Sequence, residues 1–249
     1  MSVPIEYNIV GGLLGLGQDI LLDVLTQIKY IKDTQQIIGM CKKCFVLKNH
    51  QRFNLILQNK IDPIHPEVII TNETLISQQG ASIVHIGQEE ATSIVISPII
   101  TEGIVRFEGM FYQTGSVGRY FGLADSSIIF ASGDQTWNNS KYKEKNVCYY
   151  SDGEIIHRND VWKNGNIGFN DQQSIAMEVN MNADSRTLHF FIEDKQQQNF
   201  VIDIPESVRF YVFLRYQDSS FQITRFERLQ SSSVRQIEGQ NAFKWGTEW

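Results

Sequence analysis

The sequence predicts an α+β protein that is mainly β, in which a short helical segment precedes an antiparallel β-sandwich. The first sixty residues carry apolar side chains with a helical period, whereas the chain beyond about residue 82 alternates short apolar runs with turns. Hydrophobic residues make up 42% of the 249 residues and charged residues 20%, as in a globular protein. A chain of this length can bury a core in each of two parts.

Residues 1–60 are expected to form helices. The first begins near Gln18, because the apolar residues that follow recur every three or four positions, at Ile20, Leu21, Val24, Leu25, Ile28 and Ile31. Asp33 or Thr34 can cap a second helix that runs to about Leu47. Two short helices bury little surface, so a third helix within NHQRFNLIL or a partner is needed.

Cys41 and Cys44 form a C-x-x-C motif in the expected second helix, and His50 follows. On one helix the two cysteines share a face, while His50 lies about 240° round from Cys44. No second cysteine pair follows to complete a four-ligand zinc site. A thioredoxin-like pair would be expected after a strand. We therefore expect core or interface cysteines and no bound metal, with metal and redox roles as alternatives.

The helical segment resembles an F-box over about residues 14–53. That family shows a Leu-Pro-x-Glu-like start, an apolar helix, an Asp-Leu-like cap and a Val-Cys-x-x-Trp-like end. The corresponding positions are Leu16, Asp19, Ile20, Leu21, Leu25, Ile28, Asp33, Cys41 and Phe45. Gly17 stands where the family usually has Pro, Thr34 where it has Leu, and Met40 where it has Val.

The F-box resemblance implies binding of a Skp-type adaptor through Leu16, Ile20, Leu21 and Leu25. The alternative is a helical hairpin that only packs on the second domain.

Pro63 and Pro66 oppose helix continuation, and residues 61–81 are expected to be a linker. Residues 82–229 are expected to form the sandwich, with candidate strands in ATSIVIS, GIVRFEGMFY, RYFGLA, SIIFAS, SIAMEVNM, TLHFFIED, NFVIDI, VRFYVFL and SFQITRFERL. Alternation places Ile175, Met177, Val179 and Met181 on one face, and NADSR joins that strand to the next as a hairpin. Residues 230–249 are expected to fold back on the sandwich.

Residues 82–229 resemble a SPRY domain, a concanavalin-like sandwich, through several motifs in the family's order. These are GIVRFEGMF, YFGLADSS, YYSDGEIIH and the long stretch from Gly168 to Leu214 that contains SIAMEVNM, TLHFFIED and VRFYVFL. Asn180 replaces the usual Asp, and Glu193-Asp194 replaces Asn-Gly. The resemblance implies a module that binds short peptides or folded proteins through loops at one rim.

The expected rim loops of this chain are rich in Trp, Tyr and Arg, the side chains that most often anchor interfaces. We therefore expect the target-binding residues to be Arg119, Tyr120, Trp137, Tyr142, Tyr149, Tyr150 and Trp162. For each ring, the alternative is a place in the core or in loop packing.

Charge and motifs argue against several other functions. Residues 1–60 hold seven Lys and Arg against four Asp and Glu, and residues 61–249 hold 15 against 24, with no basic stripe for nucleic acid. No apolar run reaches the roughly 20 residues of a membrane span. Glu178 lacks a second carboxylate on its strand face, and no nucleophile elbow or phosphate-binding loop is present, so no enzyme activity or cofactor is expected.

Together the two resemblances imply a substrate receptor of a cullin-based ubiquitin ligase. The alternatives are a SPRY scaffold protein without a ligase role and, more remotely, a lectin-like glycan binder. The three cysteines do not form a disulfide framework, and the apolar stretch from Ile9 to Leu16 lacks the basic flank of a signal peptide, so a cytoplasmic or nuclear location is expected.

Overall fold

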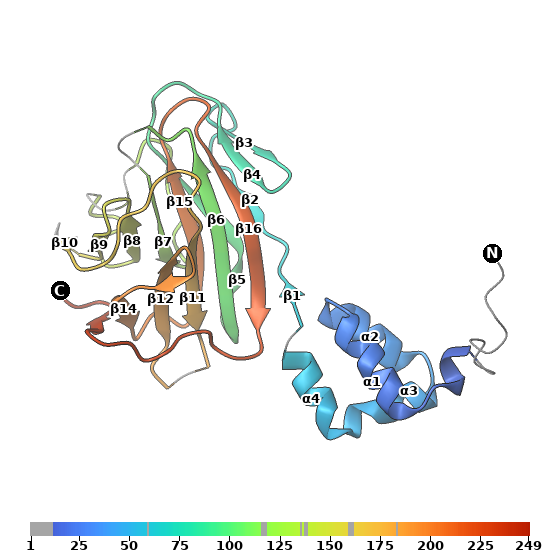
Figure 1. Ribbon diagram of the computed structural model, residues 1–249. Helices are drawn as coiled ribbons and strands as arrows, with labels where there is room; N and C mark the ends of the chain where they lie inside the picture. Colours follow the sequence, from blue (N-terminus) through green and yellow to red (C-terminus); the bar gives the residue numbers. More distant parts are fainter. Residues whose placement is uncertain are drawn as a thin grey trace. The chain divides into compact units, whose positions relative to one another are not determined.

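The computed structural model describes residues 12–58, 60–115, 119–134, 136, 139–158, 162–182 and 184–249. The chain forms two compact units. The first comprises residues up to Pro63 with Arg228–Ser231, and the second comprises Ile64–Glu227 with Ser232–Trp249. The described helices lie in the first unit and a sandwich of mainly antiparallel sheets forms the second, so the predicted fold class is confirmed (Figure 1).

The helical unit contains more and shorter helices than the sequence predicts. Its elements are a 3₁₀ helix at Gly12–Gly15, α1 at Gln18–Gln27, α2 at Ile31–Gly39, α3 at Lys42–Val46, a second 3₁₀ helix at Leu47–Asn49, α4 at Gln51–Gln58 and the short strand β1 at Asp62–Pro63. The expected second helix is interrupted because Cys41 has an extended backbone, with φ −160° and ψ 164°. None of the described helices is long and apolar enough to cross a membrane.

The buried face of α1 overlaps the predicted face at Leu21 and Leu25 but is shifted around the helix. Leu22 is buried, whereas Ile20 and Val24 are exposed. The buried residues come from all parts of the unit and are Leu21, Leu22, Leu25, Ile38, Leu47, Phe53 and Ile56. The side chains of Arg52 in α4 and Asp23 in α1 form an ion pair at 2.6 Å. The ion pair and the shared core join α4 to α1.

Lys60 completes the end of α1. Its buried ammonium group donates hydrogen bonds to the carbonyl oxygens of Leu25, at 2.7 Å, of Thr26, at 3.1 Å, and of Ile28. The Leu25 carbonyl also accepts the backbone N–H of Ile28, the residue that caps α1, at 3.2 Å. A cation at a helix C-terminus is favourable. Burial lowers the pKa of Lys60.

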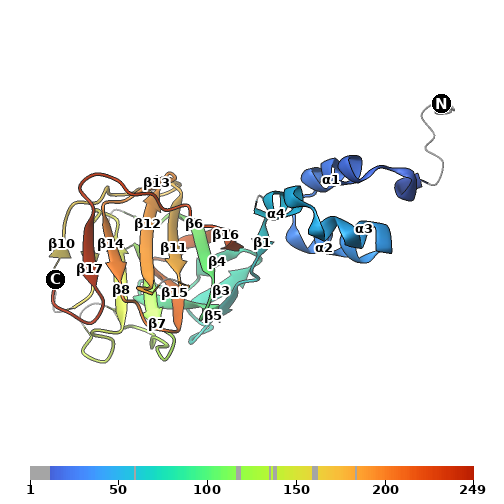
Figure 2. The same cartoon turned by 90° about the horizontal axis from the view of Figure 1, so that it is seen from below.

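The sandwich consists of two sheets that lie as layers (Figure 2). One sheet has the strand order β17, β14, β12, β11, β6, β16, β4, β3, and β13 pairs with β12. Its strands are β3 Ile76–Gln79, β4 Ser82–His85, β6 Ile104–Tyr112, β11 Ile175–Asn180, β12 Thr187–Ile192, β13 Lys195–Gln196, β14 Asn199–Ile202, β16 Ser220–Leu229 and β17 Asn241–Lys244.

The other sheet has the order β10, β9, β8, β7, β15, β5, β2. Its strands are β2 Glu67–Ile69, β5 Thr92–Ile100, β7 Tyr120–Asp125, β8 Asn146–Tyr150, β9 Ile155–Ile156, β10 Trp162–Lys163 and β15 Val208–Leu214.

Three segments differ from the sequence expectation or extend it. The expected linker at 61–81 contains β2, which pairs with β5, and β3, which pairs with β4. SIIFAS is not a strand, because a turn at Asp125 directs it across the sheet, where Ile128 and Phe130 are buried. In the C-terminal segment, β17 pairs with β14 in parallel, and this segment therefore lies on the sandwich.

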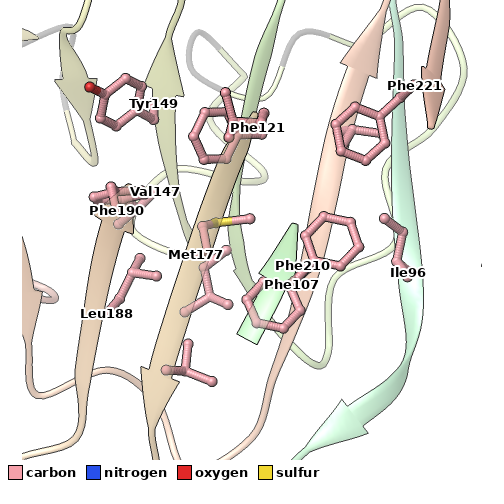
Figure 3. Close-up of a cluster of buried hydrophobic side chains, with 14 of the residues drawn as sticks. Ile96, Phe107, Phe121, Val147, Tyr149, Met177, Leu188, Phe190, Phe210 and Phe221 are labelled. Carbon is pink, nitrogen blue, oxygen red and sulfur yellow. The ribbon is translucent and has the colours of Figure 1, made fainter. Parts of the chain in front are cut away.

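The main core lies between the sheets and is rich in aromatic rings (Figure 3). Phe107 of β6 stacks on Phe210 of β15 at 5.1 Å between ring centroids, and on Phe221 of β16 at 5.8 Å. Met177 of β11 is also buried there, in the alternating face that the sequence predicts. The hairpin of β11 and β12 has the predicted antiparallel pairing.

A second core covers the outer face of the β7, β8 and β15 sheet. The described residues of the segment from Ser126 to Lys145 cross this face and contribute Ile128, Phe130 and Tyr142. The strands contribute Val95, Tyr120, Ala124, Cys148, Ile156, Tyr211 and Phe213. Neighbouring residues of β7 are consequently buried on opposite faces.

Asn146 is the polar centre of this second core. Its amide nitrogen donates to the carbonyl oxygens of Thr136, at 3.2 Å, and Tyr142, at 2.9 Å. Its amide oxygen accepts a hydrogen bond from the Tyr211 hydroxyl at 2.9 Å. Its backbone oxygen accepts one from Nδ1 of His157 at 2.8 Å. One side chain thus joins the crossing segment to two strands.

His157 holds the C-terminal segment on the sheet. Because its Nδ1 donates to Asn146, its Nε2 is left to accept the backbone N–H of Gly246, at 2.7 Å. The ring lies between Trp245, at 4.7 Å, and Trp249, at 5.0 Å. Acceptance at Nε2 requires neutral imidazole, and burial lowers the pKa of His157 accordingly.

Gly122 should be intolerant of any side chain. A Cβ on this residue of β7 would collide with the carbonyl oxygen of Val147 and lie 2.7 Å from the Tyr211 ring. We expect Gly122→Ala to lower the free energy of unfolding by about 2 kcal/mol, because β7 must move from its neighbours. Urea unfolding measures the loss. Gly39→Ala, where a Cβ meets no atom within 4 Å, is the control and should not destabilise.

The second stability prediction concerns pH. Since the folded state lowers the pKa of His157 below 6.5, neutral His157 favours folding above pH 6.5, and this contribution is lost as the pH falls towards the folded pKa. His189, buried against Phe200, has its pKa lowered to about 4 and acts in the same direction. We expect the free energy of unfolding to fall between pH 7 and pH 5, and to fall less in His157→Gln. His65→Gln, at an exposed position, is the control. An unchanged pH dependence in His157→Gln would contradict this role.

Candidate functional site

Four aromatic rings cross the outer face of the second sheet and form an aromatic row, defined as Phe213, Tyr120, Tyr150 and Trp162. Ring centroids are 4.2 Å apart for Phe213 and Tyr120, 4.7 Å for Tyr120 and Tyr150, and 4.8 Å for Tyr150 and Trp162. The rings come from β15, β7, β8 and β10 in turn. Phe213 pairs directly with Tyr120, and Tyr120 with Tyr150, so strand register sets the row.

The row passes from the core to the surface. Phe213 and Tyr120 are buried, whereas Tyr150 and Trp162 are half-buried. Aromatic pairs at these separations stabilise by about 0.5–1.5 kcal/mol each beyond their buried area. Tyr150 and Trp162 therefore pack against the rings behind them and are only partly buried.

The buried end of the row is polar but uncharged. The Tyr120 hydroxyl accepts hydrogen bonds from the backbone N–H of Thr136, at 3.4 Å, and from its hydroxyl, at 3.3 Å. Burial raises the pKa of Tyr120 and raises that of the neighbouring Cys148 thiol to about 12. Both groups are consequently neutral at physiological pH, and neither is poised as a nucleophile.

Arg119, predicted to bind a target, is instead buried, with its guanidinium over the ring of Phe169 in the main core. Its guanidinium donates to the Thr114 hydroxyl at 3.1 Å, and to the carbonyl oxygens of Gly115 and Phe169 at 2.8 and 3.1 Å. Asp171 accepts from the backbone N–H and hydroxyl of Thr114 at 3.0 and 2.5 Å. Arg119 therefore joins two loops and positions the rim.

Three predicted target-binding tyrosines, Tyr120, Tyr142 and Tyr149, are core residues. The Tyr142 hydroxyl donates a hydrogen bond to Asp134 at 2.6 Å, and its ring packs on Phe130, another residue of the crossing segment. Tyr149 faces the other sheet and donates its hydroxyl to the carbonyl oxygen of Ile167 at 2.6 Å. Their rings are buried because both faces of the sheet are covered.

Of the predicted target-binding residues, Tyr150 and Trp162 are both half-buried, and their rings are in contact. Trp137 lies outside the described residues. Phe213 was missed because it falls in the strand-forming run VRFYVFL, although alternation along that run places Tyr211 and Phe213 on the face opposite Phe210 and Val212.

The predicted adaptor-binding residues separate in a similar way. Leu21 and Leu25 are buried in the helical core, Leu16 is half-buried and Ile20 is 51% exposed. The unit exposes further large apolar side chains, which with Ile20 we call the exposed apolar set: Ile20, Val24, Met40, Phe45, Val46 and Leu55.

Neither the cysteine motif nor Glu178 forms a metal site or a carboxylate pair. Among the described residues, no group of three or more His, Cys, Asp or Glu side chains is placed to hold a metal ion. The Glu178 carboxylate is buried and accepts hydrogen bonds from Ser232, at 2.6 Å, and from the backbone and hydroxyl of Ser233. Glu178 thus fixes the segment that leads to β17.

Comparisons with known proteins give structural neighbours but no sequence match. No protein-family model and no curated protein matches the sequence. The structure is similar to a human SPRY domain, with a TM-score of 0.48 and 13% identity over 68% of this chain and 99% of that chain. It is similar to the SPRY domain of human HERC1, with a TM-score of 0.47 and 12% identity over 69% of this chain and 99% of that chain. It is also similar to the TRIM65 PSpry domain, with a TM-score of 0.48 and 9% identity over 66% of this chain and 94% of that chain.

Removing the Asp171 carboxylate should loosen the rim. We expect Asp171→Ala to lower the free energy of unfolding by about 2 kcal/mol, because the Thr114 N–H loses its acceptor and the buried Arg119 guanidinium loses its ion-pair partner. Urea unfolding measures this loss. Glu206→Ala, at an exposed position, is the control and should change the free energy by less than about 0.5 kcal/mol. Equal effects of the two substitutions would contradict the role of Asp171.

Proposed function

We propose that this chain is a protein-binding receptor made of two modules. The sandwich binds a peptide segment or a folded protein target at the rim where the aromatic row reaches the surface. The helical unit binds a Skp-type adaptor, which makes the chain a substrate receptor of a cullin-based ubiquitin ligase. The observation that carries this proposal is the pairing of a rigid, half-exposed Tyr150–Trp162 site with a small helical unit that leaves large apolar side chains uncovered.

The target-binding part rests on the aromatic row. Trp and Tyr anchor interfaces because they bury a large area at little cost in conformational entropy. Tyr150 and Trp162 are additionally supported from behind by Tyr120. The ordered SPRY-like motifs of residues 82–229 independently favour a module that binds proteins at its loop rim.

The adaptor-binding part rests on the exposed apolar set. A core of short helices cannot bury every apolar side chain, and an apolar surface that remains exposed commonly marks a docking site. In this proposal Ile20 and Leu16 contact the adaptor, whereas Leu21 and Leu25 are buried and stabilise the helical unit. Leu21→Asp would therefore unfold the unit, and the test of docking needs exposed positions.

Substitution of Trp162 tests target binding. We expect Trp162→Ala in the full chain to reduce capture of its target by about 30-fold, equivalent to about 2 kcal/mol at an interface anchor. Quantitative mass spectrometry of proteins captured by the full chain and the variant provides the measurement. Circular dichroism confirms that the variant is folded.

Ile99→Ala is the matched control for Trp162. Ile99 is also apolar and partly exposed, but strand register places it at the opposite end of β5 from Ser93, which pairs with Phe213. This control should capture the target normally. If Trp162→Ala captures every partner as the unmutated chain does, the rim is not the binding site.

Charge on the exposed apolar set tests adaptor binding. We expect Ile20→Asp and Phe45→Asp each to weaken binding of a purified Skp-type adaptor at least tenfold in titration calorimetry, because a carboxylate would be desolvated in an apolar interface. Gln35→Asp adds the same charge at an exposed polar position of α2 and is the control. If the unmutated chain binds no adaptor, the ligase role is rejected and the chain is a binding module without it.

A further inference from the structure

The interruption between α2 and α3 brings the two cysteines of the C-x-x-C motif together. Cys41 has an extended backbone immediately before α3, and its sulfur accepts the backbone N–H of Cys44 at 3.4 Å. A continuous helix would not give this arrangement, because both cysteines would point outward from helical backbone.

The two thiols differ in their access to solvent. Cys44 is fully buried, whereas Cys41 is partly exposed and lines an open hollow of about 460 Å³ together with Gly39, Lys42 and Phe45. A small disulfide or peroxide can therefore reach the Cys41 sulfur. The buried Cys44 thiol is not accessible to such a molecule directly, so Cys41 meets it first.

The local electrostatics favour Cys41 as the nucleophile. Hydrogen bonds from the backbone N–H and the thiol of Cys44 lower the pKa of Cys41, and Lys43 lowers it further. Burial raises the pKa of Cys44. The thiolate is the reactive form of cysteine, so Cys41 reacts first.

We propose that Cys41 and Cys44 are a redox-active dithiol that forms a reversible intramolecular disulfide by exchange with a small-molecule disulfide. The geometry assigns attack to Cys41, which is accessible, and resolution to Cys44, which is buried against it. This role is independent of the proposed target and adaptor binding.

The exchange is balanced in two steps with glutathione disulfide as the oxidant. The Cys41 thiolate attacks one sulfur, forming a mixed disulfide as the glutathione S–S bond breaks and one glutathione thiolate leaves. Cys44 then loses its proton and attacks the Cys41 sulfur, which breaks the mixed disulfide and releases the second glutathione. The protein loses two electrons and two protons, and glutathione disulfide is reduced to two glutathione molecules.

Cys148 provides an internal control in the same chain. It is fully buried in the second core, and burial raises its pKa to about 12. It lies in β8 of the sandwich, whereas Cys41 and Cys44 belong to the helical unit. Reaction at Cys148 would report unfolding of the sandwich.

The test treats the full-length, unmutated protein with glutathione disulfide, quenches with acid, alkylates the remaining thiols and maps each cysteine by mass spectrometry. We expect a Cys41–Cys44 disulfide, two glutathione molecules released per chain, alkylated Cys148, and full reversal by dithiothreitol. With iodoacetamide instead, native Cys41 should react at least tenfold faster than Cys44 or Cys148. Equal rates, or a lasting glutathione adduct on Cys41 of the unmutated chain, would overturn the proposal.

Two substitutions separate the roles of the sulfurs. Cys44→Ser should accumulate the mixed disulfide on Cys41, because the resolving thiol is missing. Cys41→Ser should react with glutathione disulfide at least tenfold more slowly than the unmutated chain. If Cys41→Ser reacts as fast as the unmutated chain while circular dichroism shows it folded, Cys41 is not the nucleophile.

Discussion

Burial of both faces of β7, β8 and β15 is the constraint on which the sandwich depends. One face packs against the opposite sheet through Phe121, Val147 and Phe210, and the other is covered by the segment from Ser126 to Lys145. A sheet with one solvated face would have exposed Tyr120 and Tyr211. Because it is covered instead, polar groups beneath the segment must be paired, and Asn146 provides those hydrogen bonds.

The same constraint shapes the surface that we propose for target binding. The covering segment leaves the outer end of the aromatic row half-exposed, so the rings that reach solvent are continuous with rings that are buried. Arg119 and Asp171 fix the neighbouring loops by hydrogen bonds. Tyr150 and Trp162 are thereby presented on strands, and a partner would not need to order them on binding.

The helical unit is governed by the small size of its core. Lys60 satisfies the end of α1, and the extended backbone at Cys41 divides the second helical stretch into α2 and α3. Each short helix buries one side, which leaves apolar residues such as Phe45 exposed and places Cys41 beside the buried Cys44. The extended backbone at Cys41, in place of a continuous helix, thus produces both the exposed surface of α3 and the arrangement of the two thiols.

The sequence by itself determined the fold class, the main strands, the β11–β12 hairpin and the position of α1, because periods of two and 3.6 residues record which face is apolar. Tertiary structure alone decided which apolar face is covered. Leu22 is buried in a core that residues of α2 and α4 complete, whereas Ile20 is exposed. Tyr142 is buried because an irregular segment crosses a sheet. Neither outcome leaves a periodic pattern in the local sequence, because each depends on residues that are distant in the chain. For that reason, of the residues predicted for the candidate site, the partly buried Tyr150 and Trp162 are the ones that it retains.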